Sequence, residues 1–136
     1  MQQVTGVLVV QNGKYVVQKR DNIPTISEPG KHSLWGGAAE DDETPLQTAC
    51  RELFEETGVQ SPPDAFIHLT SYETASKSPR HKGKPVAVHL YAVELNDETF
   101  INCYEGEKLV RISGLADLQG DEVTEFLVKA VCLYEQ

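Results

Sequence analysis

The chain has 136 residues, of which 40% are hydrophobic and 24% charged, so it is long enough for one compact domain and too short for two ordinary ones. We therefore expect a single domain over residues 1–136. The formal net charge of −9 argues against a surface that binds a nucleic acid polymer, because that mode of binding needs clustered lysine and arginine. If the substrate is an anion, a bound metal ion is the natural source of positive charge.

The N-terminal segment predicts neither export nor a membrane anchor. The opening residues lack a basic region, and the apolar run 7–10 is far shorter than a signal core or a membrane span. Three widely spaced cysteines, Cys50, Cys103 and Cys132, form no CxxC pair and indicate neither a zinc site nor a disulfide framework. These features predict a reduced, cytoplasmic protein with no membrane partner.

The first part of the chain predicts a β-hairpin followed by a loop. Residues 4–10 are rich in β-branched side chains, Asn12-Gly13 is the strongest two-residue hairpin signal, and residues 15–19 form the returning strand. Residues 21–33 contain asparagine, proline and glycine without periodicity, so we expect a loop there. Long loops of this kind often carry substrate contacts.

Local signals from Thr44 onward predict a helix. Thr44 at the N-cap, Pro45 at the first helical position and Gln47 three residues after the cap form a capping box. Gly58 supplies the stop signal at the other end. Apolar residues recur between these caps at helical spacing, namely Leu46, Ala49, Cys50 and Leu53.

The second half of the chain predicts three strands and a final helix. Residues 66–72 and 86–95 read as strands separated by a polar segment, and residues 108–112 read as a third strand. An amphipathic helix is expected near the C-terminus from the spacing of Val123, Phe126, Leu127, Ala130 and Val131. Strands interleaved with two helices predict an α/β (α+β) fold with a mixed sheet covered on both faces.

One face of the first predicted helix carries three carboxylates, opposite the apolar stripe. Glu52, Glu55 and Glu56 fall within an arc of roughly 100 degrees at helical spacing. A solvated acidic face is the plain alternative. However, Glu52 and Glu56 form a like-charge i,i+4 pair, and Glu55 and Glu56 lie in the last turn, where the helix dipole disfavours anions. We expect no lysine or arginine one turn away on the same face to offset these charges.

A divalent cation reverses the sign of these local penalties. Clustered carboxylates repel one another only until a positive ion lies among them. Oxygen ligands of this type suit Mg²⁺ or Mn²⁺, and Mg²⁺ keeps positions open for water and substrate phosphate. Because violations of local rules are expected at functional sites, the cluster predicts a metal site.

Residues 37–59 resemble the Nudix box, in which a glycine and a glutamate precede the motif Arg-Glu-aliphatic-x-Glu-Glu-x-Gly-aliphatic. Two departures from the family's commonest wording lie outside the fixed positions. Trp35 stands where a proline often precedes the double glycine, and Asp41-Asp42 replaces the usual glycine before the first glutamate. Every fixed position is filled, by Gly37, Glu43, Arg51, Glu52, Leu53, Glu55, Glu56, Gly58 and Val59.

The resemblance implies a Nudix-like α/β/α sandwich, with a mixed β-sheet between helices, and a metal-dependent hydrolase. The pair matching Glu43 and Arg51 typically forms a salt bridge that positions the helix, so Arg51 is expected to support the site first and to bind phosphate second. Gly37 and Gly58 complete the structural positions of the box. By the same resemblance, the expected metal ligands are Glu52, Glu55, Glu56 and the backbone carbonyl of Gly36.

The implied reaction is hydrolysis of a diphosphate (pyrophosphate) linkage in a nucleoside diphosphate derivative or a nucleoside triphosphate. A water activated by Mg²⁺ or Mn²⁺ attacks phosphorus. Some family members take a general base or a further metal ligand from a later loop, where Glu105 and Glu107 are the candidates, each with a solvated loop charge as the alternative. The residues expected to act in catalysis are Glu52, Glu55, Glu56, Arg51 and Glu107.

Three residues outside the box are candidates for contact with the substrate. Trp35 either stacks on a nucleobase or packs beside the double glycine. Arg80 and Lys82 belong, with Lys77, His81 and Lys84, to the only basic concentration of an acidic sequence, which forms either a solvated loop or a flap that contacts phosphate. The packing role and the solvated loop are the default interpretations.

Two other classes of function remain open. A nucleotide-sensing or binding module without hydrolysis is an alternative, because Nudix-like domains also occur as regulatory domains. An isomerase of the isopentenyl diphosphate type shares the fold, but no cysteine-containing motif here supports that chemistry. The sequence leaves the nucleotide-type small molecule unidentified, because specificity in this family lies outside the box, and homodimers are frequent in the family.

Overall fold

The computed structural model describes residues 1–118 and 120–136. Its main helices are α1 (Pro45–Thr57) and α2 (Glu125–Tyr134), and short 3₁₀ helices span Pro63–Ala65, Leu115–Asp117 and Gly120–Glu122. The strands are β1 (Gln2–Gln11), β2 (Lys14–Lys19), β3 (His32–Ser33), β4 (Phe66–Ala75), β5 (Pro85–Leu95) and β6 (Lys108–Ile112).

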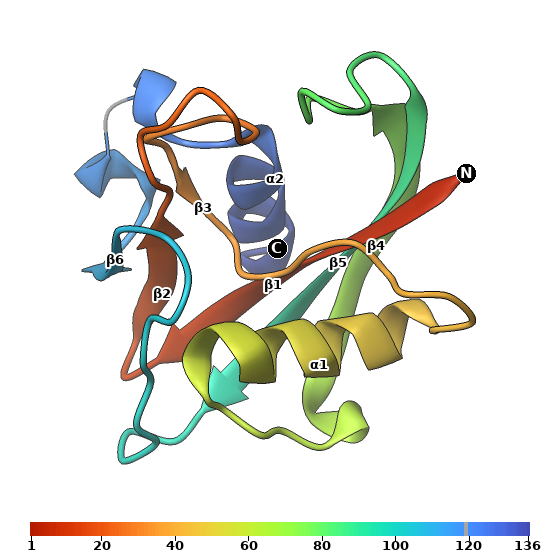
Figure 1. The fold of residues 1–136 in the computed structure, drawn as a ribbon. Helices are drawn as coiled ribbons and strands as arrows, with labels where there is room; N and C mark the ends of the chain where they lie inside the picture. Colours follow the sequence, from red (N-terminus) through yellow and green to blue (C-terminus); the bar gives the residue numbers. More distant parts are fainter. Residues whose placement is uncertain (119) are drawn as a thin grey trace.

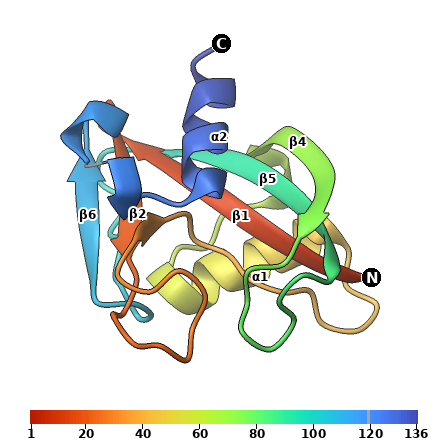
Figure 2. The same cartoon turned by 90° about the horizontal axis from the view of Figure 1, so that it is seen from above.

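The strands form one mixed sheet between the two main helices. The strand order is β3-β2-β1-β5-β4, with β6 paired to β2, and β1 runs parallel to β5 and antiparallel to β2. Figures 1 and 2 show α1 and α2 on opposite faces of this sheet. The arrangement confirms the predicted α/β/α fold class.

The β1–β2 hairpin forms where the sequence predicts it. Asn12 and Gly13 connect the strands with φ angles of 53° and 71°. Positive φ at both central residues matches the twist of the flanking strands, which explains the Asn-Gly pair. β1 is central in the sheet, and its residues Val7, Leu8 and Val9 are fully buried.

The caps of α1 also lie where the sequence predicts them. The Thr44 hydroxyl oxygen accepts a hydrogen bond from the Gln47 backbone N–H at 3.1 Å, and the Gln47 side chain accepts one from the Thr44 N–H at 2.9 Å. At the other end Gly58 adopts φ 78° and donates its N–H to the Phe54 carbonyl at 2.8 Å. These bonds satisfy backbone groups that a helix end leaves without partners.

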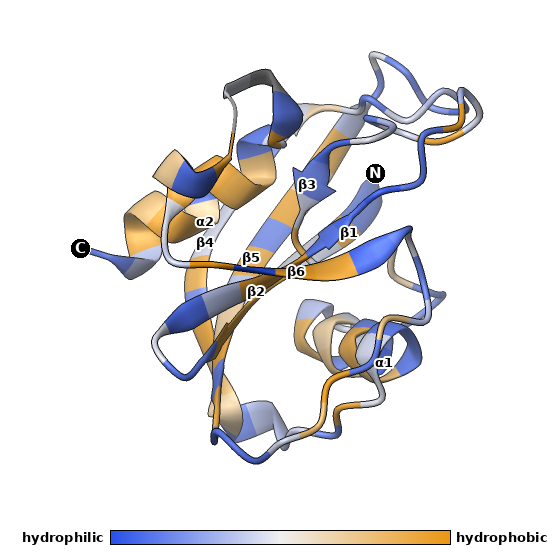
Figure 3. Cartoon of the chain, turned by 90° about the vertical axis from the view of Figure 1, so that its left-hand side faces the viewer, coloured by the Kyte–Doolittle hydropathy of each residue, from blue (hydrophilic) through white to orange (hydrophobic). Residues whose placement is uncertain are grey.

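Two hydrophobic clusters pack against the two faces of the sheet, as the alternation of side chains along a strand requires. In Figure 3 the hydrophobic colour runs along the central strands between the helices. No helix among the described residues is long and apolar enough to span a membrane. The cluster on the α1 side includes Val7, Val9, Val16, Trp35, Ala49 and Leu53, and the cluster on the α2 side includes Leu8, Val17, Val88, Leu90, Leu127 and Ala130.

The structure differs from the sequence expectations at three element boundaries. β4 and β5 extend into the polar segment between them, and the segment predicted as a loop ends in the short strand β3, which pairs with β2. Val123 lies before α2 rather than in it, because the Thr124 hydroxyl accepts from the Leu127 N–H and begins the helix there. Val123 instead forms a bridge with His32.

Candidate functional site

The segment that contains Gly36 and Gly37 runs beside β1 and defines one wall of the site. The Gly37 carbonyl accepts the Thr5 N–H at 2.9 Å, and the Trp35 carbonyl accepts the Val7 N–H at 2.6 Å. Gly36 has φ 143°, and a Cβ atom there would lie 2.2 Å from the Thr5 carbonyl oxygen. A glycine is therefore required for this close approach of two backbone segments.

Glu56 of α1 inserts beneath this segment. Its side chain is only 1% exposed, and its Oε1 accepts the Gly36 N–H at 2.9 Å. Burial raises the pKa of Glu56 to about 9, and the negative charges of Glu105 and Glu52 add to this rise. A buried carboxyl group beside other carboxylates needs either a proton or a cation to be stable.

Glu52 lies next to Glu56, and its negative charge contributes to the raised pKa of Glu56. Burial raises the pKa of Glu52 as well, against the opposing effect of Arg51. A Cβ atom at Gly37 would lie 2.8 Å from the Glu52 carboxyl carbon. The double glycine thus makes room for this pair of carboxyl groups.

Arg51 is the cation of the site. Its Nε and Nη2 donate to the two carboxylate oxygens of Glu43 at 2.7 and 2.9 Å, which is the salt bridge that the resemblance implies. Its Nη1 also lies 2.9 Å from Glu52 and 3.2 Å from Glu55. The expectation that no basic residue offsets the glutamates was wrong, because Arg51 lies one residue from Glu52 and one turn from Glu55.

Glu43 is held by more than this salt bridge. It also accepts hydrogen bonds from the Glu40 backbone N–H at 3.0 Å and the Thr48 hydroxyl at 2.7 Å. The hydrogen bonds from Arg51, followed by the one from Glu40, lower the pKa of Glu43 to about 2. Glu43 is therefore ionised at neutral pH and fixes the orientation of the Arg51 guanidinium.

The three box glutamates lie at different depths, which corrects the expectation of one carboxylate face opposite the core. Glu56 is buried, and the Glu52 side chain is 14% exposed. The Glu55 side chain is half exposed and forms an ion pair with Arg51. The cause is the Gly36–Gly37 segment, which covers the last turn of α1 on the Glu56 side. Among the described residues, no three Asp, Glu, His or Cys side chains converge closely enough to hold a metal ion as they stand.

The loop before β6 brings Glu105 toward the site and holds Glu107 away from it. The Tyr104 N–H donates to the Glu56 carbonyl at 2.8 Å, and the charge of Glu105 acts on the Glu56 carboxyl. Glu107 instead forms an ion pair with Lys19 at 3.2 Å. The charge of Glu105 therefore acts on the box, whereas the charge of Glu107 is paired with Lys19.

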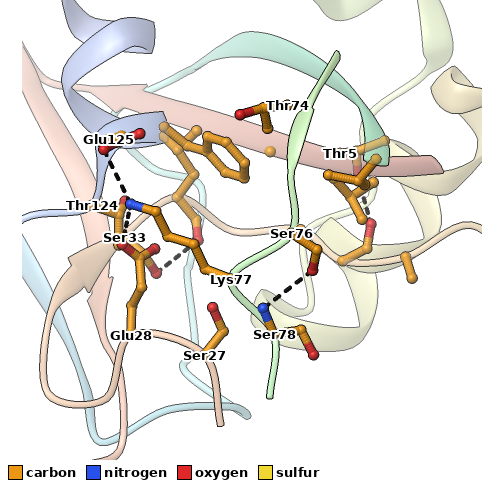
Figure 4. A pocket seen from close by; sticks show the side chains of 18 of the residues that line it. Thr5, Ser27, Glu28, Ser33, Thr74, Ser76, Lys77, Ser78, Thr124 and Glu125 are labelled. Carbon is orange, nitrogen blue, oxygen red and sulfur yellow. Dashed lines mark hydrogen bonds and ion pairs between the residues drawn. The ribbon is translucent and has the colours of Figure 1, made fainter. Parts of the chain in front are cut away.

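A cavity of about 290 Å³ begins at the double glycine and extends between the loop after β2, the tip of the β4–β5 hairpin and the start of α2 (Figure 4). Its lining is apolar over part of the wall and charged at several points. Side chains that line it include Arg20, Glu28, Leu34, Lys77, Glu125 and Phe126.

The residues considered outside the box lie where the default interpretations placed them, and not where a contact with the substrate requires. Trp35 is fully buried, and its indole N–H donates to the Val16 carbonyl at 2.9 Å, so it packs in the core and has no ring face free for a nucleobase. Arg80 and Lys82 are exposed and are not among the described residues that line the cavity. Lys77, from the same basic segment, lines it instead.

Sequence reasoning missed Arg20, Glu28 and Phe126 as residues that line the cavity. Arg20 donates its Nε to the Ser27 carbonyl at 2.7 Å, and its terminal nitrogens have no hydrogen-bond partner in the described part of the chain. The loop after β2 was recognised as a place for substrate contacts, but nothing in its composition separates Arg20 and Glu28 from ordinary surface charges. Phe126 was assigned to the core because it follows the helical apolar spacing.

Comparisons with known proteins agree with this geometry. The family model of the NUDIX domain matches residues 1–127. Phosphatase NudJ of Escherichia coli strain K12 is 36% identical over 96 residues, which cover 68% of this chain and 54% of that protein. The chain spans about half the length of the curated relatives it matches.

Two solved structures share the fold at low sequence identity. A MutT NUDIX hydrolase from Burkholderia pseudomallei superposes with a TM-score of 0.74 at 21% identity, covering 98% of this chain and 95% of that one. A bifunctional NMN adenylyltransferase/ADP ribose pyrophosphatase from Francisella tularensis, complexed with AMP and an Mn ion, superposes with a TM-score of 0.72 at 20% identity, covering 98% and 41%. With the family model matched over nearly the whole sequence, the chain belongs to the NUDIX domain family.

Proposed function

We propose that this protein is a divalent-metal-dependent hydrolase that cleaves a diphosphate linkage in a nucleotide-type compound. The observation that carries the proposal is the carboxyl pair Glu52–Glu56, held under the double glycine at one end of a ligand-sized cavity. Membership of the NUDIX family and the names of its hydrolase and phosphatase relatives support the same class of reaction.

The donor chemistry of the site fits a hard divalent cation. Of these two neighbouring carboxyl groups, Glu56 is fully buried and the charge of Glu52 disfavours its ionisation, so a cation between them removes the need for a proton. Glu52, Glu56, the Gly36 carbonyl and, after release from Arg51, Glu55 are the proposed ligands. When bound, Mg²⁺ or Mn²⁺ offsets the negative charge of the diphosphate and lowers the pKa of a coordinated water.

The remaining residues of the chain prepare the reaction. Glu43 fixes Arg51, and Arg51 in turn holds Glu52 and Glu55 in place through its Nη1. In the proposed hydrolysis, water attacks one phosphorus, the bridging P–O bond breaks, and a carboxylate of the chain takes the proton of the water. Glu105 is the proposed acceptor, because its charge acts on Glu56 whereas Glu107 pairs with Lys19.

The cavity next to the double glycine is the proposed place for the rest of the substrate. Phe126 and Leu34 line it and supply apolar surface for a ring, while Arg20 supplies guanidinium nitrogens for a phosphate. The AMP and Mn ion in the Francisella structure support a nucleotide-type ligand and a divalent metal. We also propose that residues 1–136 act as one domain, because the family model and the sheet extend over nearly all of them.

A phosphate-release screen tests the proposal directly. The purified protein is incubated with nucleoside triphosphates, dinucleoside polyphosphates, ADP-ribose and nucleotide sugars, each with Mg²⁺ and with Mn²⁺. Turnover of at least one class that stops on chelation of the metal is the expected result. Tight nucleotide binding without hydrolysis in either metal favours the sensing module instead.

A thermal melt provides a second test that needs no substrate. Because the carboxyl pair is stabilised by a cation, millimolar Mg²⁺ or Mn²⁺ should raise the Tm of the protein. The matched control is Glu56→Gln, in which the increase should shrink. An unchanged Tm in the unmutated protein contradicts the proposed metal site.

A further inference from the structure

Lys77 joins three segments at one end of the cavity. Its ammonium nitrogen lies 3.1 Å from the Glu125 carboxylate and 3.5 Å from the Glu28 carboxylate. Lys77 belongs to the tip of the β4–β5 hairpin, Glu28 to the loop after β2, and Glu125 to the first turn of α2. Figure 4 shows the ammonium group between the two carboxylates.

This charged end is remote from the proposed catalytic centre. In Figure 4 the group of Lys77, Glu28 and Glu125 lies on one side of the view, and Thr5, whose hydroxyl donates to the Gly37 carbonyl at 3.4 Å, lies on the other. A substrate whose diphosphate lies at the double glycine therefore reaches Lys77 with its opposite end. Lys77 meets a part of the substrate that does not react.

Glu125 can release Lys77 at little cost. The Glu125 side chain is 77% exposed, and it lies in the first turn of α2, where the helix dipole stabilises a carboxylate. Glu28 has a second cationic neighbour, Lys31, at 3.8 Å. The Lys77–Glu125 pair is exposed and therefore weak, so the ammonium group can exchange this partner for another anion.

The charged side chains that line this end are balanced, although the chain as a whole has a net charge of −9. The cavity is lined by Arg20 and Lys77 as well as by Glu28 and Glu125, so the opposing charges balance there. Lys77 also begins the basic segment of the hairpin, which continues with Arg80, His81, Lys82 and Lys84.

We propose that Lys77 is a specificity-determining residue that binds a second anionic group, at the end of the substrate remote from the cleaved diphosphate. The proposal rests on the proposed function for the position of the diphosphate. On binding, the ammonium group exchanges Glu125 for the anion and forms a charge-assisted hydrogen bond. The preferred substrates are thus diphosphate compounds with an additional phosphate or carboxylate.

NADPH and NADH provide a matched pair of probes, because both contain a central diphosphate and they differ by one ribose phosphate. Their Kd values are measured by nicotinamide fluorescence with Mg²⁺ on a Glu55→Gln background, where hydrolysis is expected to be blocked. KM values are measured without that change. A charge-assisted hydrogen bond in a partly exposed site predicts about tenfold tighter binding of NADPH.

Variants of Lys77 show whether the preference for NADPH depends on the positive charge of the side chain. Lys77→Met should reduce the preference for NADPH to within about twofold, and Lys77→Arg should retain most of it. The control is Lys84→Met, an exposed lysine of the same hairpin that is not among the described residues lining the cavity; it should leave the preference unchanged. A similar loss in the control overturns a specific role for Lys77.

The outcomes separate this inference from the proposed function. Selectivity for NADPH that depends on Lys77, without hydrolysis of either compound, supports the role of Lys77 and contradicts the proposed reaction. Hydrolysis with equal KM for the two compounds overturns the role of Lys77 and leaves the reaction in place. Failure to bind either compound at millimolar concentration also overturns the role of Lys77.

Discussion

Behind the double glycine at which the cavity begins, Arg51 of α1 forms hydrogen bonds with Glu43, Glu52 and Glu55, and Glu56 is buried beneath Gly36. At the far end of the cavity, Lys77 forms ion pairs with Glu28 and Glu125; the Lys77 side chain is half exposed and that of Glu125 is largely exposed. Both ends use ion pairs, but only the first is built into the core of the fold. The difference suggests a rigid centre for chemistry and an exchangeable end for recognition, and variants at each end can break that contrast.

The largest effect on activity is expected from Glu56→Gln. The amide oxygen still accepts the Gly36 N–H, so the fold should persist, but the negative charge that a cation needs is lost. We expect kcat on the best substrate of the screen to fall by about a thousandfold or more. The control is the exposed Glu98→Gln, and near-normal turnover by Glu56→Gln in steady-state assays contradicts the proposed role of the carboxyl pair.

Gly37→Ala should impair activity more than folding. Its added Cβ would lie 2.8 Å from the Glu52 carboxyl carbon, so the side chain of Glu52 must shift while the backbone of residue 37 needs no positive φ. Displacing one ligand of this kind should lower kcat/KM by about 10–100-fold. Gly114→Ala is the matched control, because a Cβ there meets nothing within 4 Å. Equal activity of the two variants would falsify the close fit of Glu52 beneath the double glycine.

The parts of this contrast that could be predicted from the sequence are the local ones. Thr44, Gln47 and Gly58 define α1 because a helix cap needs only residues within a few positions of one another. The β1–β2 hairpin was predictable for the same reason, since Asn12-Gly13 determines the turn by itself. The resemblance to the Nudix box added the pairing of Glu43 with Arg51.

The depth of Glu56 and the role of Lys77 were not predictable, because both depend on segments far apart in the chain. Glu56 is buried by a segment that hydrogen-bonds to β1, and helical periodicity places its side chain on the polar face. Lys77 meets Glu28 across a sequence separation of 49 residues. The sequence identified the correct basic hairpin. It did not distinguish Lys77 from Arg80 and Lys82, because the folded turn decides which of these side chains lines the cavity.

Glu43→Gln tests how strongly the α1 end is held by charge. The folded-state pKa of Glu43 is about 2, against an ordinary value of 4.5, so its ionised form contributes stability above pH 4.5 that is lost as the pH falls toward 2. The variant should therefore be less stable than the unmutated protein at pH 7, and the two should converge between about pH 4.5 and 2. Urea unfolding at several pH values measures this difference. A gap that stays constant across that range, or one equally large for the exposed control Glu73→Gln, contradicts a charge-dependent role for Glu43.

The smallest effect on stability is expected at the other end of the cavity. Lys77→Met removes two ion pairs. Lys77 is half exposed and Glu125 is mostly exposed, so solvent already screens that pair, and the less exposed Glu28 keeps Lys31 as a partner. We expect the free energy of unfolding to change by less than about 1 kcal/mol, as is usual for surface pairs. Urea unfolding at low and moderate salt measures this change. A loss of several kcal/mol, comparable to disruption of a buried network, would show that Lys77 holds the hairpin to α2 as a structural element and is not free to exchange Glu125 for a substrate anion.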